Sequence, residues 1–338
     1  MFGSEESINK LLVRNVSTDW SQFAGLPFAF DFEARFAQMF GSEESLNKLL
    51  VRNVSTDWSQ FAGLPFAFDF EARFARDFHR QWLYHHWWVS IYVCVLYVTL
   101  VLVGQHVMSR RPKPLSLRVA LFCWNLFLAF FSIVGTIRCL PEFVSVIRTS
   151  GLESSYCVSS YYDDVRLTFW YWVFVWSKVV ELGDTGFIIA RKQTLIPLHW
   201  IHHVLTLSYA FFVIGEAPAS ARWMVNMNFT IHSLMYSYYA LKAIRVPVSR
   251  TIAMAITTAQ ILQMVFGLYI NFFAFHQKWS GRHCDTSISA SASGLILYAL
   301  FFALFINFFA KTYGNRFTLK SMKRLLSGAA KDVLNKVD

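Results

Sequence analysis

The sequence predicts an all-α polytopic membrane protein with seven transmembrane helices, a lumenal N-terminus and a cytosolic C-terminus. Of the 338 residues, 55% are hydrophobic. Only 15% are charged, whereas soluble domains usually carry about 25%. The apolar residues form runs close to the length of about 20 residues that a helix needs to cross a bilayer. The basic residues cluster in short loops between these runs, as Lys and Arg do between the spans of multi-pass membrane proteins.

Seven apolar stretches predict the spans. The fourth stretch is short and the fifth is interrupted by polar residues, but both have the length and flanks of a spanning helix. The predicted spans are residues 86–106, 115–137, 168–190, 195–214, 222–243, 251–273 and 289–310.

Loop charge predicts the orientation of these spans. Basic residues follow the first, third, fifth and seventh spans, and the alternate loops hold acidic residues with few basic ones. Because cytosolic loops carry an excess of Lys and Arg, the N-terminus is expected in the lumen and the C-terminus in the cytosol. The net charge of +10 follows from this loop pattern and not from a basic stripe, so nucleic acid is not expected as a partner.

The N-terminal end contains an internal repeat, because residues 1–38 recur almost unchanged as 39–76. Two near-identical copies are too few for a solenoid, so we interpret the repeat as a recent duplication or a gene-model artefact that adds little to function. The expected organisation is a duplicated segment at 1–76, a seven-helix domain at 77–315 and a basic cytosolic tail at 316–338.

Two of the five cysteines fall in loops that this topology places in the lumen, Cys157 after the second span and Cys284 after the sixth. A disulfide between them is compatible with an oxidising compartment, and two unpaired loop thiols are the alternative. The other three cysteines lie in or at the ends of spans, where packing is the expected role.

Four clusters of polar residues interrupt the third to sixth spans. They are KVVELGDT at 178–185, HWIHH at 199–203, NMNFTIHSLMYSYY at 226–239 and TTAQILQ at 257–263. At a rise of about 1.5 Å per residue, all four fall in the cytosolic half of the bilayer, so we expect them to meet at one depth. The candidate residues are Lys178, Glu181, Asp184, Thr185, His199, His202, His203, Asn228, His232, Tyr236, Tyr239, Gln260 and Gln263.

Ionisable residues inside a membrane are costly and usually serve a function. Three imidazoles within five residues crowd one side of a helix, so we assign them chemistry rather than packing. The polar residues of the other clusters could instead have purely structural roles. Gln260 and Gln263 are suited to hydrogen bonds between helices, and Lys178 with Glu181 or Asp184 is suited to a structural ion pair.

The histidines favour covalent chemistry over a metal. Of the ten histidines, only four lie in the clustered core, fewer than the histidine boxes of di-iron desaturases and hydroxylases need. We therefore expect no metal and keep a histidine-box desaturase or hydroxylase as the alternative function. A seven-helix transporter with a proton relay is disfavoured, because clusters at one cytosolic depth provide no path to the lumen. Neutral imidazoles in a low-dielectric site are nucleophiles suited to acyl transfer from a thioester.

The four clusters resemble the motifs KxxExxDT, HxxHH, HxxMYxYY and TxxQxxQ of the ELO-type very-long-chain fatty acid elongases, over roughly residues 80–315. The stretches NMNFTIHSLMYSYYALKA and FSIVGTIR are most similar to the subgroup that extends saturated and monounsaturated acyl chains. The resemblance implies a multi-pass enzyme of the endoplasmic reticulum membrane. Its reaction would condense acyl-CoA with malonyl-CoA into a 3-oxoacyl-CoA two carbons longer, releasing CO2 and CoA. The resemblance implies no cofactor besides these substrates. It also implies contacts with other enzymes of the elongation cycle, and it is compatible with a homo-oligomer.

The resemblance also suggests roles for individual residues. His202 is expected to accept the acyl group, with His232 as the alternative or the partner, while the other two histidines of HWIHH orient it or move protons. Asp184 and Glu181 are expected to hold an imidazole in one tautomer. The expected substrate-binding residues are Lys178, Thr185, Asn228, Tyr236, Tyr239, Gln260, Gln263, Arg191 and Lys192, of which the last two have ordinary loop charge as the alternative.

Overall fold

The computed structural model describes residues 67–314. These residues belong to one compact unit of the chain. The predictions for the first copy of the repeat, for most of the second copy and for the tail at 316–338 lie outside this range.

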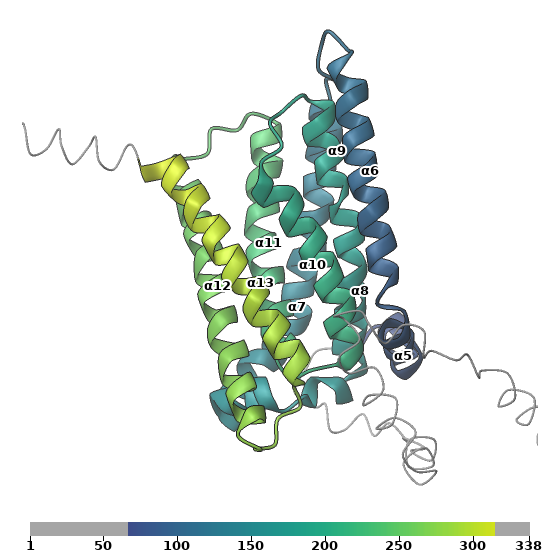
Figure 1. Ribbon diagram of the computed structural model, residues 1–338, viewed down its shortest axis with the longest axis vertical. Coiled ribbons are helices and arrows are strands. Elements are labelled where there is room, and N and C mark those ends of the chain that lie inside the picture. Colours follow the sequence, from purple (N-terminus) through teal and green to yellow (C-terminus); the bar gives the residue numbers. More distant parts are fainter. Residues whose placement is uncertain (1–66, 315–338) are drawn as a thin grey trace, which may run out of the picture. The chain divides into compact units, whose positions relative to one another are not determined.

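Every regular element between residues 67 and 314 is helical. Successive long helices run up and down, so that the connections after α6, α9 and α11 lie at one end (top of Figure 1) and those after α7, α10 and α12 at the other. The elements are α4 (Asp69–Ala72), α5 (Arg76–His86), α6 (Val89–Ser109), α7 (Arg118–Cys157), η3 (Ser160–Asp163), α8 (Val165–Glu181), α9 (Gly183–Ala190), α10 (Pro197–Glu216), α11 (Ala221–Ala243), α12 (Arg250–Trp279), α13 (Ile288–Phe309) and η4 (Ala310–Gly314).

Five helices of the described part are long and apolar enough to cross a membrane: α6, α7, α10, α12, and α13 continued through η4. All seven predicted ranges overlap helices, but two of them fall outside this set. The predicted third span, 168–190, consists of two shorter helices, α8 and α9, which meet at Leu182. The predicted fifth span coincides with α11, which carries the polar cluster 226–239.

The helix α7 extends far beyond the predicted span 115–137. It continues to Cys157 and includes Pro141, with a junction between two helical segments at Gly151. Gly151 has a φ of +84°, which glycine adopts without the steric cost that a Cβ would bring. The second segment carries the chain to the end where α12 connects to α13.

The helices pack in an order that places α10 centrally. In Figure 1, α6 forms one edge and α12 with α13 the other, with α10 between them. α10 contacts α5, α6, α8 and α13, while α7 packs along α11. Phe174, Phe211 and Phe229 are among the buried core residues between these helices. At Gly135 of α7 a Cβ would lie 2.6 Å from the Phe229 ring, so the absence of a side chain lets α7 and α11 approach closely.

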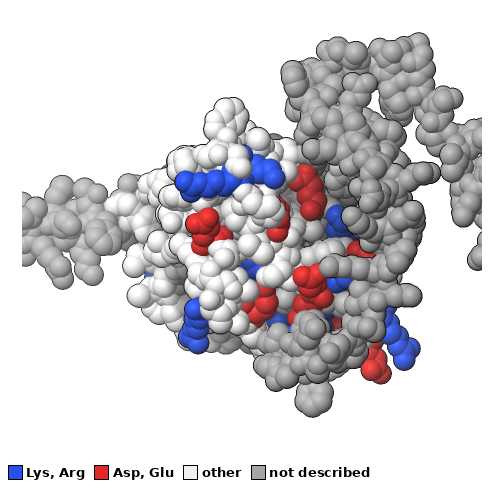
Figure 2. Space-filling view, turned by 90° about the horizontal axis from the view of Figure 1, so that it is seen from below, with Lys and Arg blue, Asp and Glu red and all other residues white. Residues whose placement is uncertain are grey.

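The two ends of the bundle differ in charge. The connections 110–117, 191–196 and 244–249 contain Lys and Arg and no Asp or Glu, and we call their side of the bundle the basic end. At the opposite end, acidic side chains are exposed among basic ones (Figure 2). Glu153, Asp163 and Asp285 are exposed there. The described helices thus carry the charge asymmetry on which the predicted orientation depends.

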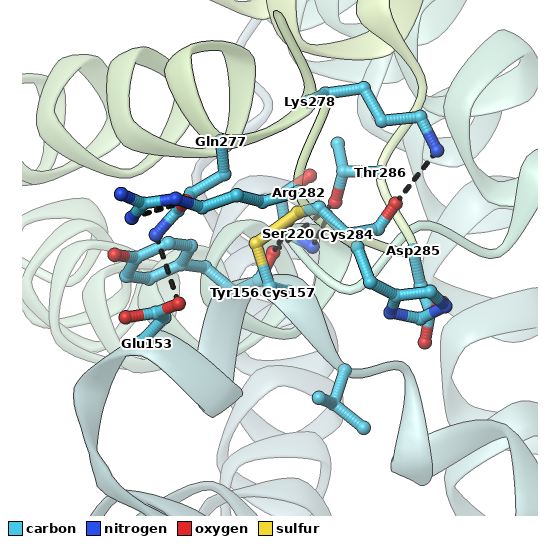
Figure 3. Close-up of a disulfide and its surroundings, with 12 residues drawn as sticks. Glu153, Tyr156, Cys157, Ser220, Gln277, Lys278, Arg282, Cys284, Asp285 and Thr286 are labelled. Carbon is cyan, nitrogen blue, oxygen red and sulfur yellow. Dashed lines mark hydrogen bonds and ion pairs between the residues drawn. A yellow bond between two sulfur atoms is a disulfide. The ribbon is translucent and has the colours of Figure 1, made fainter. Parts of the chain in front are cut away.

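A disulfide joins Cys157, at the end of α7, to Cys284, in the connection between α12 and α13 (Figure 3). These are the two cysteines that the sequence analysis pairs. Backbone contacts surround the bridge, because Asp285 N donates to the Cys157 carbonyl at 2.8 Å and the Thr286 hydroxyl donates to the Tyr156 carbonyl at 3.2 Å. We call this side of the bundle the disulfide end.

A buried arginine lies near the same end. Arg222 of α11 is 0% exposed and pairs with Glu142 of α7 at 2.9 Å. Its guanidinium also donates to the carbonyls of Ser155 and Val158, at 2.8 and 2.9 Å. The Ser160 hydroxyl accepts a further hydrogen bond at 2.7 Å. Because a buried charge must be paired and hydrogen-bonded, this arrangement ties α7, α11 and η3 together.

The end of the repeat, residues 67–76, is part of the helical bundle. Glu71 is 0% exposed and pairs with Arg138 of α7 at 2.5 Å. The Trp170 indole of α8 donates to the same carboxylate at 2.7 Å. Residues 67–76 thus pack as part of the helical bundle, and this part of the duplicated segment has a structural role that the sequence did not suggest.

Candidate active site

A cavity of about 330 Å³ lies between α10, α11, α12 and α13, towards the basic end. All four polar clusters contribute to its wall, as the estimate of a common depth predicts. Five predicted site residues do not line it: Lys178, Glu181, Thr185, Arg191 and Lys192. Those that line it are Asp184, His199, His202, His203, Asn228, His232, Tyr236, Tyr239, Gln260 and Gln263.

The three histidines of α10 lie against one another and against α13. The ring of His199 is 4.5 Å from that of His203, and the rings of His202 and His203 are 5.8 Å apart. His202 also packs on Phe301, with 4.7 Å between ring centroids. Its Nδ1 atom is buried and has no hydrogen-bond partner within residues 67–314. No hydrogen bond at Nδ1 from these residues therefore selects one tautomer of His202.

His232 of α11 belongs to a buried ring of polar side chains. Lys178 Nζ donates to Glu181 Oε1 at 2.7 Å and to Asn228 Oδ1 at 2.8 Å. The Asn228 amide nitrogen lies 3.2 Å from His232 Nε2, and His232 Nδ1 lies 3.7 Å from Glu181 Oε1. All four side chains are buried.

This ring determines the tautomer of neutral His232. Because the Lys178 ammonium is a donor only, it faces the carbonyl oxygen of Asn228 and leaves the amide N–H for His232. Nε2 of His232 must then accept, and the ring proton lies on Nδ1, facing Glu181. Glu181 thus has the orienting position that the sequence analysis gives to a carboxylate.

Asp184 differs from that expectation. Its carboxylate accepts from the Trp124 indole at 2.6 Å and from the Tyr236 hydroxyl at 2.8 Å. No hydrogen bond or ion pair joins it to an imidazole among the described residues. The neighbouring Thr185 contacts the histidine cluster instead, because its hydroxyl lies 2.9 Å from His199 Nε2. The two carboxylates of KVVELGDT therefore face different partners, and only Glu181 faces a histidine.

The remaining candidates divide between the cavity wall and the surface. Gln260 Nε2 lies 3.3 Å from Met235 Sδ, and Gln263 is buried in the wall. Arg191 and Lys192 are exposed in the connection between α9 and α10, and the Lys192 ammonium donates to the Arg111 carbonyl. The structure does not bring these two basic residues together with the other candidates.

Several residues of the site were missed by the sequence analysis. Trp124 of α7 holds Asp184, and Tyr97 of α6 contacts Thr185 at 2.7 Å. Both lie in predicted apolar spans, where an aromatic residue is usually taken as packing. Their hydroxyl and indole N–H groups could have indicated a polar partner, because a buried Tyr O–H or Trp N–H usually makes a hydrogen bond.

No group of three or more His, Cys, Asp or Glu side chains between residues 67 and 314 is arranged to hold a metal ion. Within the same residues, five apolar helices long enough to cross a membrane and a cavity lined by four histidines are the features of an integral membrane protein with a histidine-lined pocket between its helices.

Comparison with known proteins identifies the family. The sequence model of the ELO (GNS1/SUR4) family matches residues 82–322. Very long chain fatty acid elongase 6 of Drosophila melanogaster is 43% identical over 258 residues, which cover 75% of this chain and 81% of the relative. Very long chain fatty acid elongase 6 of Gallus gallus is 40% identical over 233 residues, covering 69% and 87%. Very long chain fatty acid elongase 3 of Homo sapiens is 38% identical over 234 residues, covering 69% and 86%.

The chain belongs to the ELO family of fatty acid elongases. The resemblance based on the four motifs is thereby confirmed. The family match covers α6 to α13, together with the last residues of α5, and so includes the whole cavity.

Proposed function

We propose that this protein condenses a long-chain acyl-CoA with malonyl-CoA, as the first step of a fatty acid elongation cycle. The observation that carries this proposal is the meeting of all four polar clusters in one cavity at the basic end of an apolar bundle. Motif similarity to the subgroup that uses saturated and monounsaturated chains supports these as the acyl substrates.

In the first half of the reaction a His202 nitrogen attacks the thioester carbonyl. A C–N bond forms, the C–S bond breaks, and the CoA thiolate leaves with the ring proton as free CoA. His202 lines the cavity, and its Nδ1 has no hydrogen-bond partner among residues 67–314. His232, in contrast, has Nε2 engaged by Asn228 and Nδ1 facing Glu181. This contrast favours His202 as the nucleophile and His232 as its partner.

In the second half malonyl-CoA loses CO2, and the electron pair of the broken C–C bond becomes an enolate. The enolate carbon attacks the acyl carbonyl, so that a C–C bond forms, the C–N bond breaks and the imidazole takes up a proton. Tyr236, Gln260 and Gln263 line the cavity and have the donors needed to stabilise an enolate oxygen.

We further propose that the bundle spans the endoplasmic reticulum membrane seven times, with α8 and α9 together forming the third span and α11 the fifth. The basic end would face the cytosol, because cytosolic loops are enriched in Lys and Arg. The disulfide end would then face the oxidising lumen, where a Cys157–Cys284 bridge persists. Both CoA substrates are cytosolic, which agrees with a cavity near the basic end.

The test is product formation by purified protein supplied with labelled malonyl-CoA and a saturated acyl-CoA, without NADPH. The expected product is a 3-oxoacyl-CoA two carbons longer, and His202→Ala should abolish it. His276→Ala is the control, because this exposed histidine lies at the far end of α12 and does not line the cavity. Absence of the 3-oxo product with the wild-type protein would refute the proposed reaction. Product formation by His202→Ala would refute the assigned nucleophile.

A further inference from the structure

Tyr97 lies outside the four motifs but is connected to the histidine cluster through one side chain. It belongs to α6 and is 5% exposed. Its hydroxyl lies 2.7 Å from Thr185 Oγ1, and Thr185, which is 1% exposed, lies 2.9 Å from His199 Nε2. Three helices, α6, α9 and α10, thus contribute one hydroxyl, one hydroxyl and one imidazole to a continuous hydrogen-bonded chain.

The direction of this chain follows from its donors. Thr185 has one O–H, which can point to Tyr97 or to His199. If it pointed to Tyr97, the buried Tyr97 O–H would have no acceptor among residues 67–314, and an unmade hydrogen bond of this kind is costly. The satisfied arrangement has Tyr97 donating to Thr185 and Thr185 donating to His199 Nε2. Nε2 is then an acceptor, and the proton of neutral His199 lies on Nδ1.

We propose that Tyr97 is a positioning residue that acts through Thr185 to hold His199 as the Nδ1–H tautomer, so that His199 donates a hydrogen bond to the substrate. This inference rests on the proposed condensation. His199 lines the cavity, whereas Thr185 does not. Because Thr185 takes Nε2, Nδ1 is the ring nitrogen left for a molecule in the cavity.

The choice of tautomer decides what His199 does to an acyl thioester. With the proton on Nδ1, the ring donates to the carbonyl oxygen and stabilises the negative charge that develops there during attack. With the proton on Nε2, a lone pair would face the cavity and repel that oxygen. His199 and His202 are three residues apart on α10, so the donor and the proposed nucleophile share one side of the helix.

Near-isosteric variants remove the hydroxyl groups with little change of shape. Thr185→Val removes the donor to His199, and we expect about a tenfold lower kcat with a KM close to that of the wild type. Tyr97→Phe keeps the Thr185 hydroxyl but removes the donor that orients its O–H towards His199, and we expect about a threefold lower kcat. Thr185→Ser keeps the hydroxyl and should remain close to the wild type. Tyr92→Phe is the control, because Tyr92 is on the same helix and 68% exposed.

A double-mutant cycle with His199→Ala separates positioning from a general structural role. If Tyr97 acts through His199, Tyr97→Phe has no further effect on 3-oxo product formation in the His199→Ala protein. Full activity of Thr185→Val, or an equal loss from Tyr97→Phe in both backgrounds, would overturn the inference while leaving the condensation intact. A wild-type protein that forms no 3-oxo product would overturn both.

Discussion

Lys178 and Glu181 hold opposite charges inside the bundle, each about 4% exposed. Their 2.7 Å contact is extended by Asn228 and His232, so neither charge is left without a polar partner. Removing one partner of such a pair leaves an uncompensated buried charge, which is more damaging than removing both. The ion pair proposed from the KVVELGDT spacing is therefore present, and it also orients a histidine of the cavity.

We expect Glu181→Gln to lower the free energy of unfolding by about 3–5 kcal/mol, because Lys178 remains buried without its carboxylate. The same change should abolish condensation, since His232 loses the group that faces Nδ1. Thermal unfolding in detergent and product formation measure the two effects.

The double variant Lys178→Met/Glu181→Gln is the matched comparison. It removes both charges and should recover most of the lost stability without recovering activity. A Glu181→Gln protein as stable as the wild type would show that this pair does not stabilise the bundle.

Spacing along the sequence predicted which residues share a face but not which residues they meet. Glu181 ends α8 and Asp184 lies in the first turn of α9, three residues further on, and both face α11. Their partners on α11 are His232 and Tyr236, which are one turn apart. The register of α8 and α9 against α11 decides that Asp184 meets a tyrosine. This register depends on packing between helices, which the spacing of residues along the sequence does not reveal.

At the scale of helices, contacts with residues distant in the sequence also explain why α7 extends beyond its predicted C-terminal end. The predicted span ends at 137, just before Arg138, and charged residues usually mark a membrane boundary. In the structure Arg138 pairs with Glu71 and Glu142 pairs with Arg222, so the helix continues. Both partners are more than 60 residues away along the chain, and their pairing could not be inferred from the local pattern.

The disulfide joins α7 to the connection before α13 across a sequence separation of 127 residues. Closing so long a loop restricts the unfolded chain, and disulfides of this kind typically contribute about 2–5 kcal/mol. We expect the double variant Cys157→Ser/Cys284→Ser to lose stability by about this amount in thermal unfolding. A reductant should lower the unfolding temperature of the wild type and leave that of the variant unchanged.

Cys123→Ser is the control for this prediction, because Cys123 is an exposed free cysteine. It should unfold like the wild type, with and without reductant. Equal stability of the double variant and the wild type under oxidising conditions would contradict a stabilising role for the bridge.

At the scale of the whole molecule, the sequence pattern predicted helices in all seven ranges and the meeting of the four polar clusters, and both are present in the described residues. The break at Leu182 and the polar content of α11 leave five helices that qualify as spans by length and hydropathy alone. Both weaker helices carry residues of the cavity, Asp184 on α9 and His232 on α11. In α11 the polar side chains that line the cavity lower the mean hydropathy, whereas α8 and α9 are each too short because the helix breaks at Leu182.

The proposed orientation predicts the accessibility of single cysteines in sealed microsomes. A cysteine in place of Lys192, at the basic end, should react with a membrane-impermeant maleimide added from outside. A cysteine in place of Glu153, at the disulfide end, should react only after the membrane is permeabilised. Both variants are made in a Cys123→Ser background, and the reverse pattern of labelling would invert the topology.

We propose that a histidine of this cavity carries the acyl group between the two substrates. The most direct test of this proposal is exchange of labelled CoA into acyl-CoA by the purified protein in the absence of malonyl-CoA, because formation of an acyl-imidazole is reversible and releases CoA. We expect the wild type to transfer the label and His202→Ala to transfer none. A wild-type protein that condenses acyl-CoA with malonyl-CoA but exchanges no label would contradict the proposal, as would full exchange by His202→Ala.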